Sequence, residues 1–321
     1  MKNLFKTKIF TLIVCLSIFA TSCSDDNNNE TPPVDNTITG IASKTADFSI
    51  LVQALTKAEL ATTLQGSGPF TVFAPTNDAF TAFLTAGGYA SINDVPKAAL
   101  TQVLLNHVVS GAVKSTDLTT TYIKTLAKGT ASTTNNLSMF VNTTSGNVKL
   151  NGVATVTTAD IIASNGVIHI VDKVIDLPTI VTHATANPNF TSLVGALTGA
   201  GQPDFVTILS GVGPFTVFAP TNDAFTSLNT ELAPGGIASV SAANLTKVLQ
   251  YHVVSGNILA ASLTEGQIVS TLQTPQTFTI QLTGGATIKD ANNRISTIVA
   301  TDVQCSNGVI HVLNKVLLPT L

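Results

Sequence analysis

The stretch from Gly68 to Phe80, GPFTVFAPTNDAF, occurs twice in this chain of 321 residues, because residues 213–225 repeat it letter for letter. Its first part, Pro69 to Ala74, is a short apolar run, which predicts a strand buried on both faces. The polar residues that follow are suited to starting a helix, with a threonine cap and negative character in the first turn. They are Thr76, Asn77 and Asp78 in the first copy, and Thr221, Asn222 and Asp223 in the second.

Further blocks repeat on both sides of this stretch. Residues 107–111 (HVVSG) recur 145 positions later, and residues 165–169 (NGVIH) recur 142 positions later. A repeat of this length is a whole domain and not a solenoid unit. Leu-Pro closes each copy, so we predict two abutting domains over residues 37–177 and 178–321, in a fixed mutual orientation.

Within each copy the hydrophobic period changes from helical to strand-like. Residues 48–55 and 100–107 carry apolar side chains at helical spacing, and we expect the second helix to end near Ser110-Gly111. Later stretches alternate as strands do, with hairpin turns at Ser145-Gly146 and Gly284-Gly285. The expected strands are Leu137–Asn142, Val148–Leu150, Val153–Thr158 and Val167–Val171. Helices followed by paired strands favour an α+β class.

The two repeated blocks, with their order and the closing Leu-Pro, resemble the fasciclin domain over about Thr37 to Leu321. The resemblance implies two tandem fasciclin-like domains, each a wedge of strands flanked by helices, with a role in adhesion and no common catalytic machinery. It also implies a partner contact at Tyr251, His252, Val253 and Val254, which match an adhesion-linked tyrosine-histidine pair with neighbouring aliphatics. The first copy has Asn106 in place of the tyrosine, which makes it the weaker candidate.

The N-terminal residues predict export and lipid attachment. Residues 1–22 combine three lysines with a short apolar run, as in a signal peptide. Ala20-Thr-Ser-Cys23 resembles a lipobox, which implies lipidation at Cys23; an ordinary cleaved signal peptide is the alternative. Ser24-Asp-Asp26 resembles a surface-export signal, and residues 23–36 are expected to be a flexible tether. We therefore expect an outer-membrane lipoprotein displayed on the cell surface.

The charge balance excludes some partners. The chain has 15 basic and 18 acidic residues, and removal of the three lysines of the leader leaves a net charge of −6. Without a basic cluster, nucleic acid is not an expected partner. No later segment has 18 consecutive apolar residues, so the lipid is the only predicted membrane attachment. Charged residues make up 10% of the chain, against about 25% in typical domains.

Paired histidines raise the question of a metal site. His107 and His169, with Asp160, would form one such set, and His252 and His311, with Asp302, the other. Zinc needs three or four converging ligands, and the sequence shows no paired ligand spacing. We favour packing and hydrogen bonding: His107 near helix carbonyls, His169 and His311 on a strand face, and Asp160 and Asp302 accepting backbone amides. No metal or other cofactor is predicted.

No catalytic residue is predicted either. Gly-x-Ser-x-Gly does not occur, and Cys305 aligns with Ala163 of the first copy, which favours a buried packing role. The function expected is a non-catalytic surface protein that binds another cell, a matrix polymer, a protein or a second copy of itself. A carbohydrate-binding accessory protein is the alternative, although the chain has no Trp and only three Tyr. A hydrolase would need a pocket joining His, Asp and a nucleophile.

Overall fold

The computed structural model describes residues 34–144 and 146–321. The predictions for the signal peptide, for Cys23 and for residues 24–33 of the tether lie outside the described residues, as does Ser145 of a predicted turn. Residues Asp35–Leu321 form one compact unit that holds both copies of the repeat. Within the described residues no helix combines the length and the apolar character needed to cross a bilayer.

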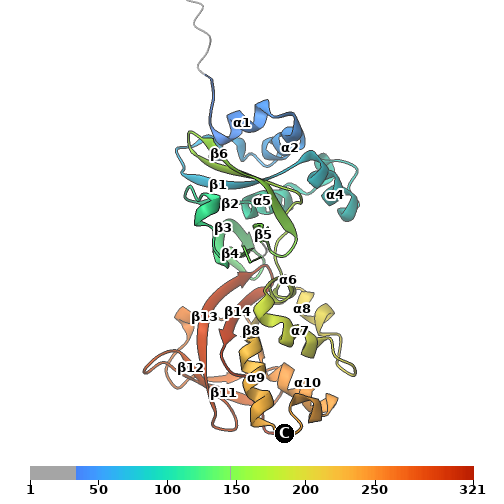
Figure 1. Ribbon diagram of the computed structural model, residues 1–321, viewed down its shortest axis with the longest axis vertical. Coiled ribbons are helices and arrows are strands. Elements are labelled where there is room, and N and C mark those ends of the chain that lie inside the picture. The colour runs from blue at the N-terminus through green and yellow to red at the C-terminus, as the bar shows by residue number, and fades with distance from the viewer. Residues whose placement is uncertain (1–33, 145) are drawn as a thin grey trace, which may run out of the picture. The chain divides into compact units, whose positions relative to one another are not determined.

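In both copies most helical elements come early in the chain, with one strand among them, and most strands come later (Figure 1). The helical elements of the first copy are α1 (Ile38–Lys44), η1 (Ala46–Phe48), α2 (Ser49–Lys57), α3 (Ala61–Gln65), α4 (Asn77–Gly87), η2 (Ile92–Asp94), α5 (Lys97–Asn106) and η3 (Ser115–Asp117). Those of the second are α6 (Ile180–Ala186), η4 (Pro188–Phe190), α7 (Thr191–Leu197), α8 (Phe205–Ser210), α9 (Asn222–Glu231), η5 (Ile237–Ser239), α10 (Ala242–Tyr251) and η6 (Ala260–Ser262).

Within the part of the chain that the structure describes, seven strands per copy complete the α+β architecture that the sequence predicts. In the first copy they are β1 (Phe70–Pro75), β2 (Val108–Ser110), β3 (Thr121–Gly129), β4 (Ser132–Asn142), β5 (Lys149–Leu150), β6 (Ala154–Ala163) and β7 (Gly166–Val171). In the second they are β8 (Phe215–Pro220), β9 (Val253–Ser255), β10 (Ile268–Ser270), β11 (Thr277–Gln281), β12 (Thr287–Lys289), β13 (Ile295–Cys305) and β14 (Gly308–Leu313).

The repeated apolar run forms the central strand of each copy. β1 pairs in parallel with β7 and antiparallel with β2, and the first copy closes as a barrel in the order β1 to β7. In the second copy, β8 pairs in the same two ways with β14 and β9, within a sheet of order β10-β11-β12-β13-β14-β8-β9. The parallel register joins Phe70 to Gly166 and Phe215 to Gly308.

In each copy the central strand, β1 or β8, lies between two hydrophobic cores, which explains its continuous apolar run. Val72 and Ala74 pack into a core with helices α1 to α5, whereas Phe73 between them packs into the barrel interior with Met139 and Leu150. The second copy divides in the same way, with Val217 and Ala219 on the helical side and Phe218 on the other. A strand between two cores cannot alternate apolar with polar residues.

The helix after the central strand begins as the sequence predicts. Thr76 caps α4, because its Oγ1 accepts a hydrogen bond from Ala79 N at 3.2 Å. Asn77 does more than add polarity to the first turn. Its Oδ1 accepts from Ile50 N at 2.9 Å, and its Nδ2 donates to Ala46 O at 3.1 Å, so it joins α4 to the start of α2. Thr221 and Asn222 make the equivalent contacts in the second copy, while Asp78 and Asp223 are exposed in the first turns.

The predicted end of the next helix is wrong. We expected it near Ser110-Gly111, but α5 ends at Asn106 and residues 108–110 form β2. The side chain of His107 binds the last turn of the helix, and the chain then pairs with β1 instead of continuing. Helical spacing up to His107 could not reveal this change, because Val108 and Val109 suit either structure.

The two copies contact each other through β4 and β13. Ser138 Oγ accepts a hydrogen bond from Gln304 N at 3.0 Å, and Lys124 Nζ donates to Asp302 O at 2.7 Å. Ser306 O accepts from Ala131 N at 2.9 Å. The aromatic ring of Tyr122, from the first copy, packs against the helical core of the second.

Candidate functional site

The stretch expected to contact a partner, Tyr251 to Val254, lies in the interior of the second copy. Tyr251 is fully buried, and its hydroxyl donates to Thr277 O at 2.6 Å and accepts from Ala291 N at 3.1 Å. His252, Val253 and Val254 are also buried. None of the four side chains presents a surface in this structure, so they hold the fold together here, and a role in partner contact stays a prediction.

His107 and His252 each link the end of a helix to the closing segment of their copy. His107 Nδ1 lies 2.8 Å from Val103 O, and its Nε2 accepts from Ile175 N at 2.8 Å. A carbonyl on one side and an amide N–H on the other assign the proton to Nδ1. Burial lowers the pKa of His107 to about 4, which keeps this neutral form at physiological pH.

His252 repeats this arrangement in the second copy. Its Nδ1 lies 2.7 Å from Val248 O, and its Nε2 accepts from Leu317 N at 2.9 Å. Burial again lowers the pKa to about 4. Both ring nitrogens of each histidine are therefore occupied by the backbone, and neither is free to bind a metal or to move a proton.

His169 and His311 occupy the central parallel strands. His169 Nε2 lies 2.9 Å from Val113 O, and its Nδ1 accepts from Asp160 N at 3.2 Å. His311 Nε2 lies 2.8 Å from Ile258 O, and burial lowers its pKa. Each ring stacks on the phenylalanine of the repeated strand, at 5.5 Å from Phe73 and 5.2 Å from Phe218. These contacts fix the rings as parts of the inner core.

Asp160 and Asp302 accept backbone amides, but they lie in strands and not in loops. Each occupies an irregularity of β6 or β13 with a positive φ, 62° and 57° respectively. Asp160 accepts from both Oγ and N of Ser115, and these hydrogen bonds lower the pKa of its carboxyl. Asp302 Oδ1 accepts from Ala260 N at 2.9 Å. Each carboxylate thereby holds the chain segment that follows the short strand β2 or β9.

Asn165 and Asn307 do more than form the turn that precedes β7 and β14. Asn165 Oδ1 accepts from Ile38 N at 2.9 Å, and its Nδ2 donates to Leu64 O and Gly66 O at 2.7 and 2.8 Å. Asn307 makes the same three bonds to the start of α6 and the end of α8. The only sequence signal was that Asn is repeated where turn chemistry would also accept Asp or Gly.

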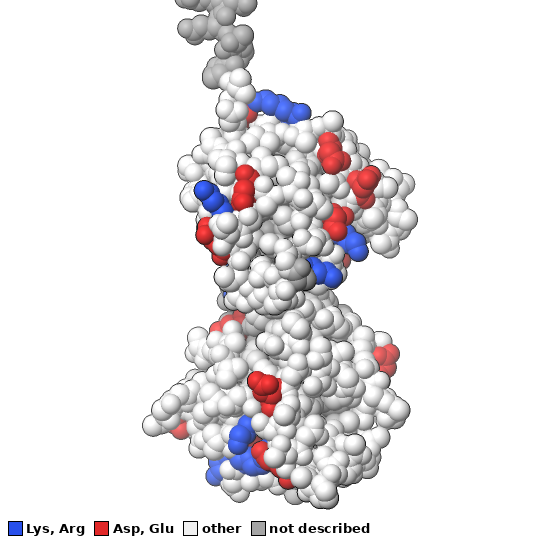
Figure 2. Space-filling model, in the orientation of Figure 1, with Lys and Arg blue, Asp and Glu red and all other residues white. Residues whose placement is uncertain are grey.

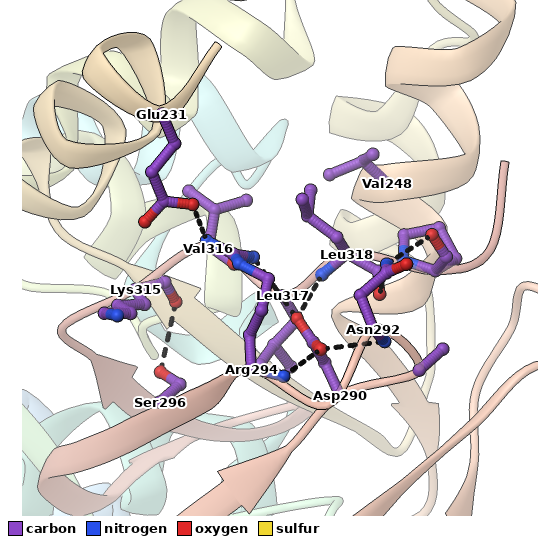
Figure 3. A network of polar contacts seen from close by, with 12 residues as sticks. Glu231, Val248, Asp290, Asn292, Arg294, Ser296, Lys315, Val316, Leu317 and Leu318 are labelled. Carbon is purple, nitrogen blue, oxygen red and sulfur yellow. Dashed lines mark hydrogen bonds and ion pairs between the residues drawn. The ribbon is translucent and has the colours of Figure 1, made fainter.

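A network of polar contacts holds the C-terminal segment onto the second copy (Figure 3). Arg294 donates from Nη1 to Val316 O at 2.7 Å and to Asp290 Oδ2 at 3.2 Å, and from Nη2 to Glu231 Oε2 at 2.6 Å. Asp290 Oδ2 also accepts from Leu318 N at 3.0 Å. All these groups bind each other or the backbone, so the cluster acts as a clasp for the closing segment.

The first copy fastens its closing segment differently. Asn106, which replaces the tyrosine of the second copy, donates from Nδ2 to Ile175 O and Asp176 O at 3.2 and 3.0 Å. The two copies therefore differ at this position both in residue type, Asn106 against Tyr251, and in the hydrogen bonds that hold the closing segment.

Of the predicted sets, the structure brings His169 Nδ1 to 4.0 Å from Asp160 Oδ1, whereas both ring nitrogens of His107 bind the backbone elsewhere. Among residues 34–144 and 146–321 there is no group of three or more His, Cys, Asp or Glu that could hold a metal ion. Cys305 is fully buried beside Val303, and burial raises the pKa of its thiol, which keeps the nucleophilic thiolate from forming.

Charged side chains are sparse and scattered on the face shown in Figure 2, where uncharged residues cover most of both copies. No single-sign patch dominates that face. The polar groups of the repeated motifs are turned inward, and the surface on this face is mainly uncharged.

Comparison with known proteins identifies the repeat. The Fasciclin domain family model matches residues 46–178 and again residues 188–319. Protein sll1483 of Synechocystis sp. is 40% identical over 145 residues, which is 44% of this chain and 74% of that protein. Periostin of Homo sapiens is 29% identical over 266 residues, which is 80% of this chain and 29% of periostin.

A solved structure shows the same fold for the pair of copies. It is a FAS1 domain pair from the insect cell adhesion molecule Fasciclin I, with a TM-score of 0.52 at 18% identity. The match covers 83% of this chain and 95% of that chain, so it includes both copies in tandem.

Proposed function

Because this chain belongs to the fasciclin domain family and carries two copies of the domain, we propose that it is a non-catalytic adhesion protein of the bacterial cell surface. The observation that supports this proposal most is that the polar residues of the repeated motifs bind groups inside their own domain. His107, His252, Asp160 and Asn165 all bind the backbone of their own domain, which leaves the outer surface as the part that meets a partner. The insect domain pair with the same fold is named as a cell adhesion molecule.

The proposal includes a lipid anchor at the N-terminus of the processed chain. A lipid on Cys23 would hold the chain at the outer membrane, and residues 23–36 would separate the first domain from the lipid. A surface-bound protein with two binding domains gains from the raised local concentration of the second domain once the first has bound. The partner is a protein or matrix polymer, or a second copy of the chain.

Carbohydrate binding is not supported as a second function. Sugar sites generally present exposed aromatic rings, but Tyr251 is buried and Tyr122 packs against the second copy. Tyr89 is half-buried against the core of the first copy.

Cells that express the full chain test the proposal. Deleting the gene should lower attachment to matrix-coated surfaces and to other cells, and restoring the gene should restore attachment. The Cys23→Ala variant should fail to restore it, because the protein leaves the membrane fraction. The matched control is Cys15→Ala, which changes a leader cysteine outside the lipobox and should behave as wild type. Unchanged attachment of the deletion strain on every surface tried would contradict the adhesion role.

A further inference from the structure

The second copy has an open groove where the first copy is filled. The groove has a volume of about 470 Å³ and lies between α7, α9 and η5. Gly195, Gly199, Asn229, Ala238 and Val240 are among the residues that line it. We call it the η5 groove.

In the first copy a lysine side chain occupies the corresponding place. Lys57, the last residue of α2, donates from Nζ to the carbonyl oxygens of Ile92, Asn93 and Val95 at 3.0, 2.6 and 2.5 Å. These carbonyls belong to η2 and the residue after it. An ammonium group has three donors, and all three are used here.

The repeat shows which residues of the second copy correspond. The helices α2 and α7 align with a shift of 142, which places Gly199 at the position of Lys57. The elements η2 and η5 align with a shift of 145, which places Ile237, Ala238 and Val240 at the three carbonyl positions. Gly199 and these three residues all line the η5 groove.

The carbonyls remain in the second copy although the lysine does not. Ile237 O accepts a hydrogen bond from Val240 N at 3.0 Å, which leaves it a second lone pair. The carbonyls of Ala238 and Val240 receive no hydrogen bond from any residue that the structure describes. The groove is widened by smaller side chains, since Gly195 and Ala238 stand where the first copy has Gln53 and Asn93.

We propose that the η5 groove binds a lysine side chain of a partner polypeptide. The incoming ammonium would donate to the carbonyls of Ile237, Ala238 and Val240, and its aliphatic stem would lie along Ala196 and Leu245 on the groove wall. A compact ammonium suits three converging carbonyls, whereas the planar guanidinium of arginine does not. The net charge of −6 left after removal of the leader favours a cationic partner. This inference rests on the proposed adhesion function and names the chemistry of one contact.

The test uses the full mature chain and a peptide with one lysine between glycines, acetylated at its N-terminus and amidated at its C-terminus. Titration calorimetry should show saturable binding with one site per chain. The same peptide with Nε-acetyl-lysine, or with arginine, should bind at least tenfold more weakly. Absence of saturable binding by the lysine peptide, or equal binding of the acetylated peptide, overturns the proposal.

Variants tie the binding to the groove. Gly199→Lys supplies the lysine from within the chain and should weaken peptide binding at least tenfold. The substitution is tolerated sterically, because a Cβ at this position would meet Gly195 O at 3.4 Å and Ala196 O at 3.5 Å, which is ordinary contact. Thr230→Lys is the matched control, since it adds the same charge on the exposed side of α9 and should leave binding unchanged. Equal peptide binding by Gly199→Lys and wild type would overturn the assignment to this groove.

Creating a second lysine-binding site in the first copy provides an independent test. Lys57→Gly empties the equivalent place and should raise the stoichiometry from one peptide to two, provided that circular dichroism shows a folded chain. In addition, Gly199→Lys should raise the melting temperature by about 2 °C, because the new side chain satisfies its own carbonyls. Attachment of cells is measured separately, so that absence of peptide binding by the wild-type chain together with intact attachment refutes the groove and spares the adhesion role.

Discussion

The buried histidines make the stability of the protein depend on pH. Burial lowers the pKa of His107 and His252 to about 4, and that of His183 to about 3, from an unfolded value near 6.5. Below pH 6.5 the unfolded chain therefore binds protons that the folded chain does not bind. The stabilisation is complete above the unfolded pKa and is lost as the pH falls from about 6.5 toward 4.

We expect the free energy of unfolding to drop by about 4 kcal/mol between pH 7.5 and pH 5.5, since each of the three buried imidazoles contributes about 1.4 kcal/mol per pH unit below pH 6.5 and almost nothing above it. Urea titrations at both pH values measure this change. The His252→Gln variant starts from a lower stability but should show a slope about one third smaller. A free energy of unfolding that is the same at both pH values would contradict the assignment of neutral buried histidines.

Removing the hydroxyl of Tyr251 distinguishes a structural role of this residue from a role in partner binding. Tyr251→Phe removes the hydroxyl from between Thr277 O and Ala291 N, and buried groups left without partners cost about 1–3 kcal/mol. We expect this loss of stability in thermal unfolding, with attachment per folded molecule unchanged. Tyr89→Phe is the control and should change stability by less than about 0.5 kcal/mol. Loss of attachment by a fully folded Tyr251→Phe protein would instead support direct contact.

At the scale of the elements, one asparagine in each copy joins segments that are far apart in sequence. Asn307 ties the start of β14 to the start of α6 and the end of α8 through three buried or half-buried hydrogen bonds. We predict that Asn307→Ala lowers the free energy of unfolding by at least about 3 kcal/mol, since it leaves three backbone groups without their partner. Chemical unfolding measures the effect, and the exposed Asn189→Ala should be nearly neutral.

The elements also show what the sequence could predict. The apolar run of β1, the capping role of Thr76 and the strand β7 follow from local pattern and were predicted correctly. The strands β4 to β6 were also predicted, but β4 begins five residues earlier than expected and β6 continues five residues further, to Ala163. The partners of His107 and Asn165 could not be predicted, because they lie 68 and up to 127 residues away in sequence. The end of α5 was misplaced for the same reason, since pairing with β1 decides it.

The candidate sites were harder to predict, because a repeat is recognised by the residues that the copies share. The shared polar residues serve the architecture of each domain. The features that differ lie elsewhere: Lys57 against Gly199 at the η5 groove, and His183 against Ile41 beside the junction. The difference between Lys57 and Gly199 is visible in the sequence, but the carbonyls that Gly199 leaves open are not.

At the scale of the whole molecule, Tyr122 couples the two copies. Its ring lies 4.9 Å from that of Phe140 and 5.3 Å from that of His183, and its hydroxyl accepts from Asn187 Nδ2 at 3.1 Å. Phe140 belongs to the first copy, whereas His183 and Asn187 belong to the second. Tyr122 is half-buried between them, so neither copy keeps its full packing without the other.

Tyr122→Ala should therefore uncouple the copies. We expect a loss of about 3 kcal/mol, typical of removing a packed aromatic ring, and two separate transitions in calorimetry, against the single transition expected for wild type. Tyr122→Phe keeps the ring and should lose no more than about 1 kcal/mol, with one transition retained. A single transition at the wild-type temperature in Tyr122→Ala would show that this ring does not couple the domains.

The parallel pairing of β1 with β7 sets the earliest moment at which each copy can close. Phe70 pairs with Gly166, and Phe215 pairs with Gly308. The central strand of a domain therefore has no parallel neighbour until the domain is almost fully synthesised. Pairings so distant in sequence form slowly. Until its last strand is made, each domain therefore lacks a complete sheet and can pass unfolded through a narrow channel. If residues 1–22 direct the chain into an export channel, each domain completes its sheet only after its last strand has crossed the membrane.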